Sequence, residues 1–80
     1  MNKKEVSEVL EYLLEYYPEM KITEKTVFAW QEIIYFMRQE EVYKVLREHI
    51  KESIFPPKIA DIYKRWHGHM YLQSEHKPGD

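Results

Sequence analysis

Apolar residues recur every three or four positions in four stretches of the chain, a spacing typical of helices with one buried face. The first stretch covers about residues 3–17, and Pro18 ends it because the residue before a proline avoids the α region. Asn2 and Glu5 form a capping-box pattern, which predicts where this helix begins. Its apolar stripe consists of Val6, Val9, Leu10, Leu13, Leu14 and Tyr17.

The second stretch, about residues 24–37, contains a dense apolar run that reads VFAWQEIIYFMR at 27–38, and Thr23 before it is the predicted N-cap. Phe28 and Tyr35 lie on a second face of this helix, beside the main stripe. A helix that is apolar around most of its circumference is normally enclosed by neighbours, so we expect it to lie at the centre of the domain. The main stripe consists of Val27, Trp30, Ile33, Ile34 and Met37.

The third stretch covers about residues 41–53, after a short turn that we predict at 38–40. No glycine or proline marks this turn; a single continuous helix would place the apolar stripes before and after it about 150° apart. His49 lies within the third stripe, where a histidine is usually a packed, hydrogen-bonded residue rather than a ligand or a base. The other inward-facing residues are Val42, Val45, Leu46 and Ile50.

Two consecutive prolines, Pro56 and Pro57, separate the third stretch from the fourth. The fourth helix is predicted at about residues 58–67, since proline is well tolerated in the first helical turn. Phe55, held by the stiff prolines, is expected to fill the corner between the third and fourth helices. The apolar stripe of the fourth helix consists of Ile59, Ile62, Tyr63, Trp66 and Met70.

These elements predict an all-α fold, a compact bundle of four short helices with a frayed C-terminus. The apolar pattern weakens from Gly68, so we expect a helical domain at residues 1–70 and a flexible tail or short linker at 71–80. The longest apolar run is far below the ~20 residues of a membrane span, and the N-terminus lacks the apolar region of a secretory signal. With no cysteine in the chain, these features favour a cytoplasmic protein that does not bind membranes.

The chain carries 14 acidic and 12 basic residues, and its isoelectric point is about 6.1. A nucleic-acid-binding domain usually has an isoelectric point above ~9, so direct nucleic-acid binding is disfavoured. No P-loop glycine run and no H-E-x-x-H motif is present, so neither an enzyme nor a cofactor is predicted. His67, His69 and His76 are close in sequence, but helical residues two apart point about 200° apart, so no metal site is predicted either.

Two sets of residues are candidates for binding a protein partner. Tyr12 and Tyr16 lie off the apolar stripe of the first helix, one turn apart, and either flank the core or form a small aromatic patch. On the fourth helix, residues at i, i+3, i+6 and i+7 form a charged strip beside the two prolines. The strip consists of Lys58, Asp61, Lys64 and Arg65.

The segment FPPKIADIY at 55–63, together with YYP after the first helix, a tryptophan in the second and VLREHIKES at 45–53, carries a family resemblance. Over about residues 1–66 the chain resembles the N-terminal domain of the phage replicative-helicase loader and inhibitor family, found in phages and prophages of Gram-positive bacteria. The resemblance implies a non-enzymatic adaptor in the bacterial host cell. Such a protein binds the hexameric replicative helicase, inhibits its ATPase and delivers it to an origin marked by an initiator protein.

The chain departs from the family pattern in two places. Lys58 stands where family members tend to carry Thr or Ser, so only Asp61 can serve the capping box of the fourth helix. Family members also continue into a polar tail that is implicated in contacting the helicase, whereas this chain stops at Asp80. We therefore expect it to bind the helicase weakly and to keep its folded surface for another replication protein, such as the initiator.

The alternative is a small helical DNA-binding or transcription-regulating protein. Lys58, Lys64 and Arg65 of the fourth helix would then contact phosphate. A recognition helix usually offers Asn, Gln or Arg to the bases, whereas this helix offers Ile, Tyr and Trp.

Overall fold

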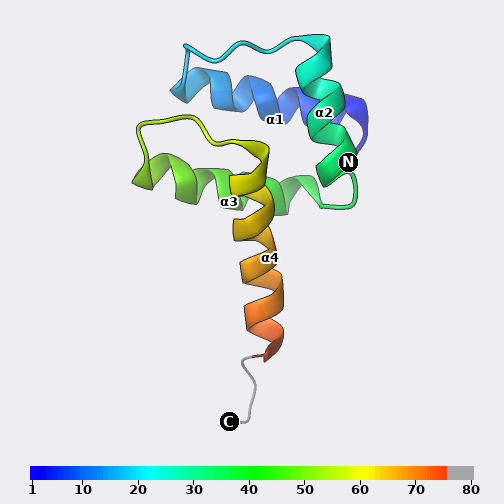
Figure 1. Ribbon diagram of the computed structural model, residues 1–80, viewed down its shortest axis with the longest axis vertical. Helices are drawn as coiled ribbons and strands as arrows, with labels where there is room; N and C mark the ends of the chain where they lie inside the picture. The colour runs from blue at the N-terminus through cyan, green and yellow to red at the C-terminus, as the bar shows by residue number, and fades with distance from the viewer. Residues whose placement is uncertain (76–80) are drawn as a thin grey trace.

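The computed structural model describes the backbone of residues 1–75 and the side chains of residues 1–69. Within this part of the chain it contains no strand and four helices, α1 (Lys3–Tyr16), α2 (Glu24–Ile34), α3 (Gln39–Glu52) and α4 (Ile59–Glu75). α1 and α3 run side by side, α2 packs on α1, and α4 crosses α3 before its C-terminal part projects away from the other helices (Figure 1). The predicted all-α fold of four helices is confirmed.

The core lies between α1 and α3 and is closed by α2 and by the first turns of α4. Four residues of α1 are fully buried, whereas α4 contributes only Ile62 to the buried set. The buried residues are Val6, Val9, Leu10, Leu13, Tyr17, Val27, Trp30, Ile34, Met37, Val42, Val45, Leu46 and Ile62. Because one buried side chain is a small anchor for a helix of this length, α4 depends on polar contacts with α3 as well.

Three helix starts are fixed locally, as the sequence predicted. Asn2 Oδ1 accepts the backbone N–H of Glu5 at 2.8 Å, and Glu5 returns the contact to the N–H of Asn2 at 3.0 Å. Thr23 caps α2 through the N–H of Thr26. At the start of α4, an Asp61 carboxylate oxygen accepts the N–H of residue 58 at 2.9 Å, so Asp61 does serve the capping box alone.

The turn between α2 and α3 lies earlier than predicted. α2 ends at Ile34 rather than at 37, and α3 begins at Gln39, so the chain turns at residues 35–38 instead of 38–40. Met37 explains the difference: it is 2% exposed, but it reaches the core from the turn, where its N–H bonds to the carbonyl of Ile34 at 3.0 Å. An apolar residue that is buried from a turn looks like one more helical position in the sequence.

α4 continues past the predicted end at residue 67 to Glu75. Gly68 lies inside the helix, and nothing would contact a Cβ placed there. A single glycine costs a helix only about 1 kcal/mol relative to alanine, which does not terminate it. The division into a domain at 1–70 and a tail at 71–80 stays a prediction.

Two expectations about packing were wrong. α2 is not enclosed: it buries one face, and four large apolar residues in and just after it are exposed, namely Phe28, Ile33, Tyr35 and Phe36. With only four short helices, the domain has no further element to cover that face. Phe55 does not fill the corner between α3 and α4; its side chain is 69% exposed, and Pro57 is buried there instead.

His49 is packed and hydrogen-bonded, as predicted. It is half-buried, its ring lies 6.1 Å from that of Tyr17, and its Nε2 lies 2.8 Å from the carbonyl oxygen of Phe55. Since a carbonyl oxygen only accepts hydrogen bonds, Nε2 of His49 carries the proton. None of the described helices is both long enough and apolar enough to cross a membrane.

Candidate partner-binding surfaces

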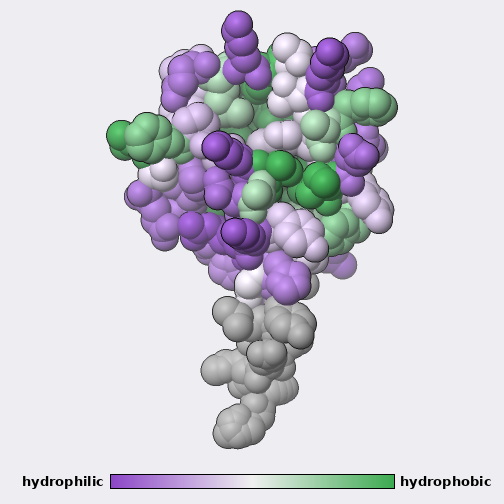
Figure 2. All heavy atoms as spheres, viewed as in Figure 1, coloured by the Kyte–Doolittle hydropathy of each residue, from purple (hydrophilic) through white to green (hydrophobic). Residues whose placement is uncertain are grey.

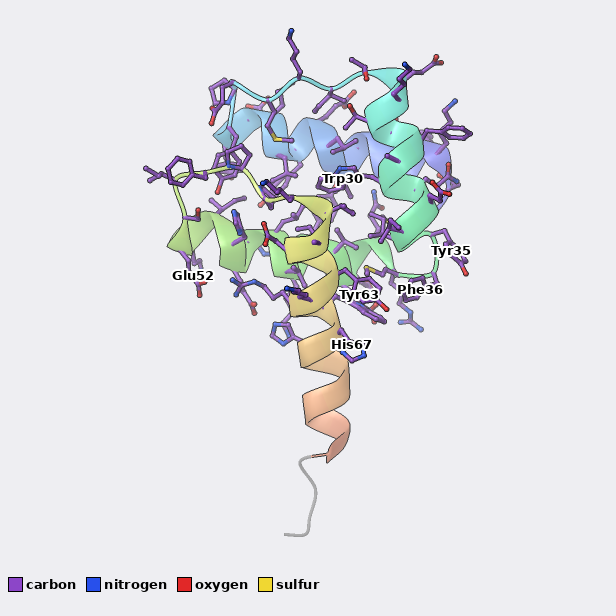
Figure 3. The ribbon with its side chains drawn as sticks, in the orientation of Figure 1. Trp30, Tyr35, Phe36, Glu52, Tyr63 and His67 are labelled. Carbon is purple, nitrogen blue, oxygen red and sulfur yellow. The ribbon has the colours of Figure 1, made fainter. Side chains whose placement is uncertain are left out.

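Four aromatic side chains meet where the end of α2 approaches α4, and we call them the aromatic surface: Tyr35, Phe36, Tyr63 and Trp66. The ring of Phe36 is at the centre, with centroids 5.4 Å from Tyr35, 6.3 Å from Tyr63 and 5.1 Å from Trp66. All three contacts are edge-to-face, the geometry that the ring quadrupoles favour. Figure 3 shows Tyr35, Phe36 and Tyr63 together on one side of the molecule.

Much of this aromatic surface faces solvent. Tyr35 is 62% exposed, Phe36 47% and Tyr63 39%, and Ile33 beside them on α2 is 40% exposed. Figure 2 shows hydrophobic residues gathered in the middle of this face, between α2 and α4. A contiguous apolar patch of this kind usually marks an interaction site.

Polar contacts hold the aromatic surface in position. Nε1 of Trp66 donates to Oε1 of Glu41 at 3.0 Å, and the same oxygen accepts the backbone N–H of Arg38 at 3.3 Å. Glu41 is the third residue of α3, so this carboxylate joins α4 to the beginning of α3. The ring of His67 stacks on Tyr63 with centroids 6.1 Å apart and extends the surface along α4. The rings are therefore in place before a partner arrives.

Sequence reasoning missed this surface. The residues were visible as apolar positions outside the main stripe of α2, but they were interpreted as contacts with further helices. The useful signal is that Tyr35 and Phe36 follow the last buried helical residue, Ile34. Two aromatic residues at the end of a helix in a four-helix domain have few elements left to cover them.

The charged strip predicted on α4 is only partly free. Lys58, Asp61 and Lys64 are exposed. Arg65 instead turns toward α3, where its guanidinium lies 2.9 Å from a carboxylate oxygen of Glu52 and 3.5 Å from one of Glu48. Arg65 therefore acts in holding α4 on α3.

Glu48 is the centre of the polar contact between these helices. Its Oε1 accepts from Nε2 of His69 at 2.8 Å as well as from Arg65. The hydrogen bond from His69, with a smaller contribution from Arg65, lowers the pKa of the Glu48 carboxyl despite partial burial. The hydrogen bond with Glu52 raises the pKa of Arg65, which stays charged.

The predicted tyrosine pair is part of a cluster on α1 and α3. The ring of Tyr12 lies 5.3 Å from that of Tyr16 and 5.0 Å from that of Tyr43, both edge-to-face. Tyr12 is half-buried against the core and Tyr16 is 53% exposed, so both of the roles left open by the sequence are present in one pair. Burial raises the pKa of Tyr12, and the neighbouring Tyr16 raises it further.

The outer side of α2 carries two open hollows that share Phe28. The larger, of about 460 Å³, is lined by Phe28, Gln31, Glu32 and Tyr35, and so adjoins the aromatic surface. The smaller is lined by Lys3, Glu24, Lys25 and Phe28. Both are open to solvent and shaped to take a side chain of a partner.

The histidines of α4 do not form a common site in the described part of the chain. His69 binds Glu48, and His67 stacks on Tyr63; His76 lies outside the described residues. Among the residues that are described, no group of three or more His, Cys, Asp or Glu side chains could hold a metal ion. What the arrangement offers is a surface for binding.

Comparison with known families agrees with this picture. Residues 1–63 match the family model for the N-terminal domain of the phage helicase loader called the gene 39 protein, which covers α1 to α3 and the first turns of α4. No curated protein and no solved structure matches the chain. The match confirms the resemblance drawn from FPPKIADIY and the segments before it. The chain belongs to this family, that of the N-terminal domain of phage helicase loaders.

Proposed function

We propose that this chain is a non-enzymatic adaptor of phage DNA replication, which binds and restrains the replicative helicase and helps to load it at the origin. The observation that supports an adaptor is the aromatic surface. The domain already has a complete buried core, yet Phe36 and Tyr63 stay substantially exposed beside Trp66. Large aromatic residues in fixed positions are the side chains that most often supply the binding energy of an interface.

We assign the aromatic surface to the initiator protein and the helicase contact to the residues that follow the folded domain. Lys64 lies next to Tyr63 on α4 and is exposed, so its charge is at the rim of the aromatic surface. Rim charges mainly set the rate of association and the choice of partner. Tyr12, Tyr16, Lys58 and Asp61 stay proposed as further contacts, whereas Arg65 is assigned to the fold.

Restraint of the helicase follows from binding alone. A partner that binds one conformation of an enzyme more tightly than another shifts the population toward that conformation. An adaptor therefore needs no catalytic group of its own; it needs a differential affinity for the two states. Because such coupling is reciprocal, helicase nucleotides should in turn change the affinity for the adaptor.

The test is titration of the purified chain against purified initiator and purified helicase. Phe36→Ser should weaken initiator binding at least tenfold, or about 1.4 kcal/mol, and Lys64→Glu should slow association. Phe28→Ser is the matched control, because Phe28 is on the same helix and more exposed, 69% against 47%, but outside the aromatic surface. Unchanged binding of Phe36→Ser to both proteins would contradict the assignment.

A DNA-binding function has less support. It would use Lys58, Lys64 and Arg65 against phosphate, but Arg65 is paired with two carboxylates. Phosphate contacts make affinity fall steeply with salt. Binding to duplex DNA with a strong salt dependence, abolished by Lys64→Glu, would favour this alternative over the adaptor.

A further inference from the structure

The loop between α3 and α4 presents two adjacent apolar side chains to solvent. Ile54 is 82% exposed, the highest value among the large hydrophobic residues described, and Phe55 is 69% exposed. Single exposed apolar residues are common on protein surfaces and need no explanation. Two consecutive ones at the tip of a loop do, because either would gain free energy by turning toward the core.

The backbone of this loop is held in place by side chains from three elements. The hydroxyl of Ser53 accepts the N–H of Phe55 at 3.1 Å and lies 3.2 Å from its carbonyl oxygen, to which it donates. Nε2 of His49 donates to the same carbonyl at 2.8 Å. From α1, the hydroxyl of Tyr17 donates to the carbonyl of Ser53 at 2.8 Å. Each of the two residues that flank Ile54 is thus fixed.

Two prolines complete the restraint. Pro56 and Pro57 have φ fixed near −65°, and Pro57 is buried, so the chain after Phe55 can neither swing nor slide. A segment that is already rigid loses little conformational entropy when it binds, which increases affinity. The loop therefore has the properties of a preformed anchor: an exposed aromatic and an exposed aliphatic side chain on a fixed backbone.

The rim of the loop is basic. Lys51 lies three residues before Ile54, Lys58 lies three residues after Phe55, and both are exposed. Among the described side chains, neither lysine has a carboxylate within ion-pair distance. The acids nearest in sequence have other partners, since Glu52 binds Arg65 and Asp61 caps α4.

We infer that the Ile54–Phe55 loop is a docking hook, whose two side chains enter an apolar pocket with an acidic rim on a protein partner. The inference rests on the proposed adaptor function, because the partner would be one of the two replication proteins that the adaptor joins. The hook is separate from the aromatic surface. The two are at opposite ends of α3, whose 14 residues span about 21 Å (Figure 1).

A protein pocket fits the hook better than a membrane or a second copy of the chain. Recognition of anionic lipid usually needs a cluster of 4–8 basic residues, whereas this rim has two and the chain carries a net charge of −2. In a symmetric dimer the same patch would meet itself, which would bring like-charged lysines together. An acidic rim on a different protein removes that repulsion.

The hook is tested with the full chain, purified helicase and purified initiator. The double variant Ile54→Ser/Phe55→Ser should bind at least one of these proteins tenfold or more weakly, with an unchanged melting temperature because both side chains are exposed. Phe28→Ser, which removes a side chain of the same 69% exposure, should bind like the parent. Lys51→Glu/Lys58→Glu should slow association with that same protein and reduce its salt dependence.

Each other outcome overturns the hook. If the double variant binds both proteins like the parent while Phe36→Ser does not, the hook is wrong and the adaptor stands. If the parent binds neither protein, both proposals fail. Binding of the parent but not of the double variant to vesicles of phosphatidylglycerol and phosphatidylcholine would show a membrane contact instead. Loss of self-association in sedimentation equilibrium would show a contact between copies.

Discussion

Replacing Trp30 by alanine should remove a large part of the stability of this domain. Trp30 is 7% exposed and is the largest member of the core. An aromatic side chain of this class buries about 150–250 Å², which at about 25 cal/mol per Å² corresponds to roughly 4–6 kcal/mol. Subtracting what the remaining alanine still buries gives about 3–5 kcal/mol, the usual cost of such truncations.

That cost is large for a chain of this size. Marginal stabilities of about 0.05–0.15 kcal/mol per residue give about 4–12 kcal/mol for the 80 residues. In domains this small, each kcal/mol shifts the melting temperature by about 4–8 °C, so Trp30→Ala should lower it by at least about 12 °C or leave no folded state.

Thermal and urea unfolding followed by far-UV circular dichroism measure this change. Phe28→Ala is the matched control: Phe28 lies two residues earlier on α2, is 69% exposed, and should change stability by about 0.5 kcal/mol or less. Comparable melting temperatures for the two variants would mean that α2 does not bury the Trp30 face. The same experiment separates the observed one-sided helix from the enclosed helix that its sequence predicted.

Two further predictions concern α4. Lys58→Thr should stabilise the domain by about 1 kcal/mol, because a threonine hydroxyl would complete the capping box to which Asp61 already contributes; a lower melting temperature than the parent would refute it. Glu48→Gln should lower the melting temperature at neutral pH. Since the folded-state pKa of Glu48 lies below its ordinary value of 4.5, this stabilisation is complete above pH 4.5 and is lost as the pH falls through the folded-state pKa. The gap between parent and variant should therefore close in acid, and a gap that stays constant down to pH 3 would contradict the role of Glu48.

The helix starts could be predicted because they depend on residues three apart in the chain. Asn2 with Glu5, and residue 58 with Asp61, make the bonds that the sequence indicated. A capping box needs only local geometry, so no knowledge of the tertiary structure is required. The buried stripe of α1 was equally readable, since its period depends only on the helix itself.

The ends of helices and the orientation of loop side chains could not be predicted in this way. Met37 is buried from a turn, and Phe55 is exposed although it precedes two prolines. In both cases the position of the side chain follows from where a distant part of the chain makes contact. Tyr17 and His49 fix the loop that exposes Phe55, and Tyr17 is 36 residues away from the group it binds.

The sequence by itself determined the helical class, the four segments, the caps and the family of this protein. Only the tertiary structure decided which apolar and charged residues are left for partners. It turned Arg65 onto Glu48 and Glu52 and left Phe36 with Tyr63 in solvent. The physical reason is that periodicity specifies which residues share a helix face, whereas burial depends on how many other helices reach that face. In a domain of four short helices, some apolar faces are left uncovered.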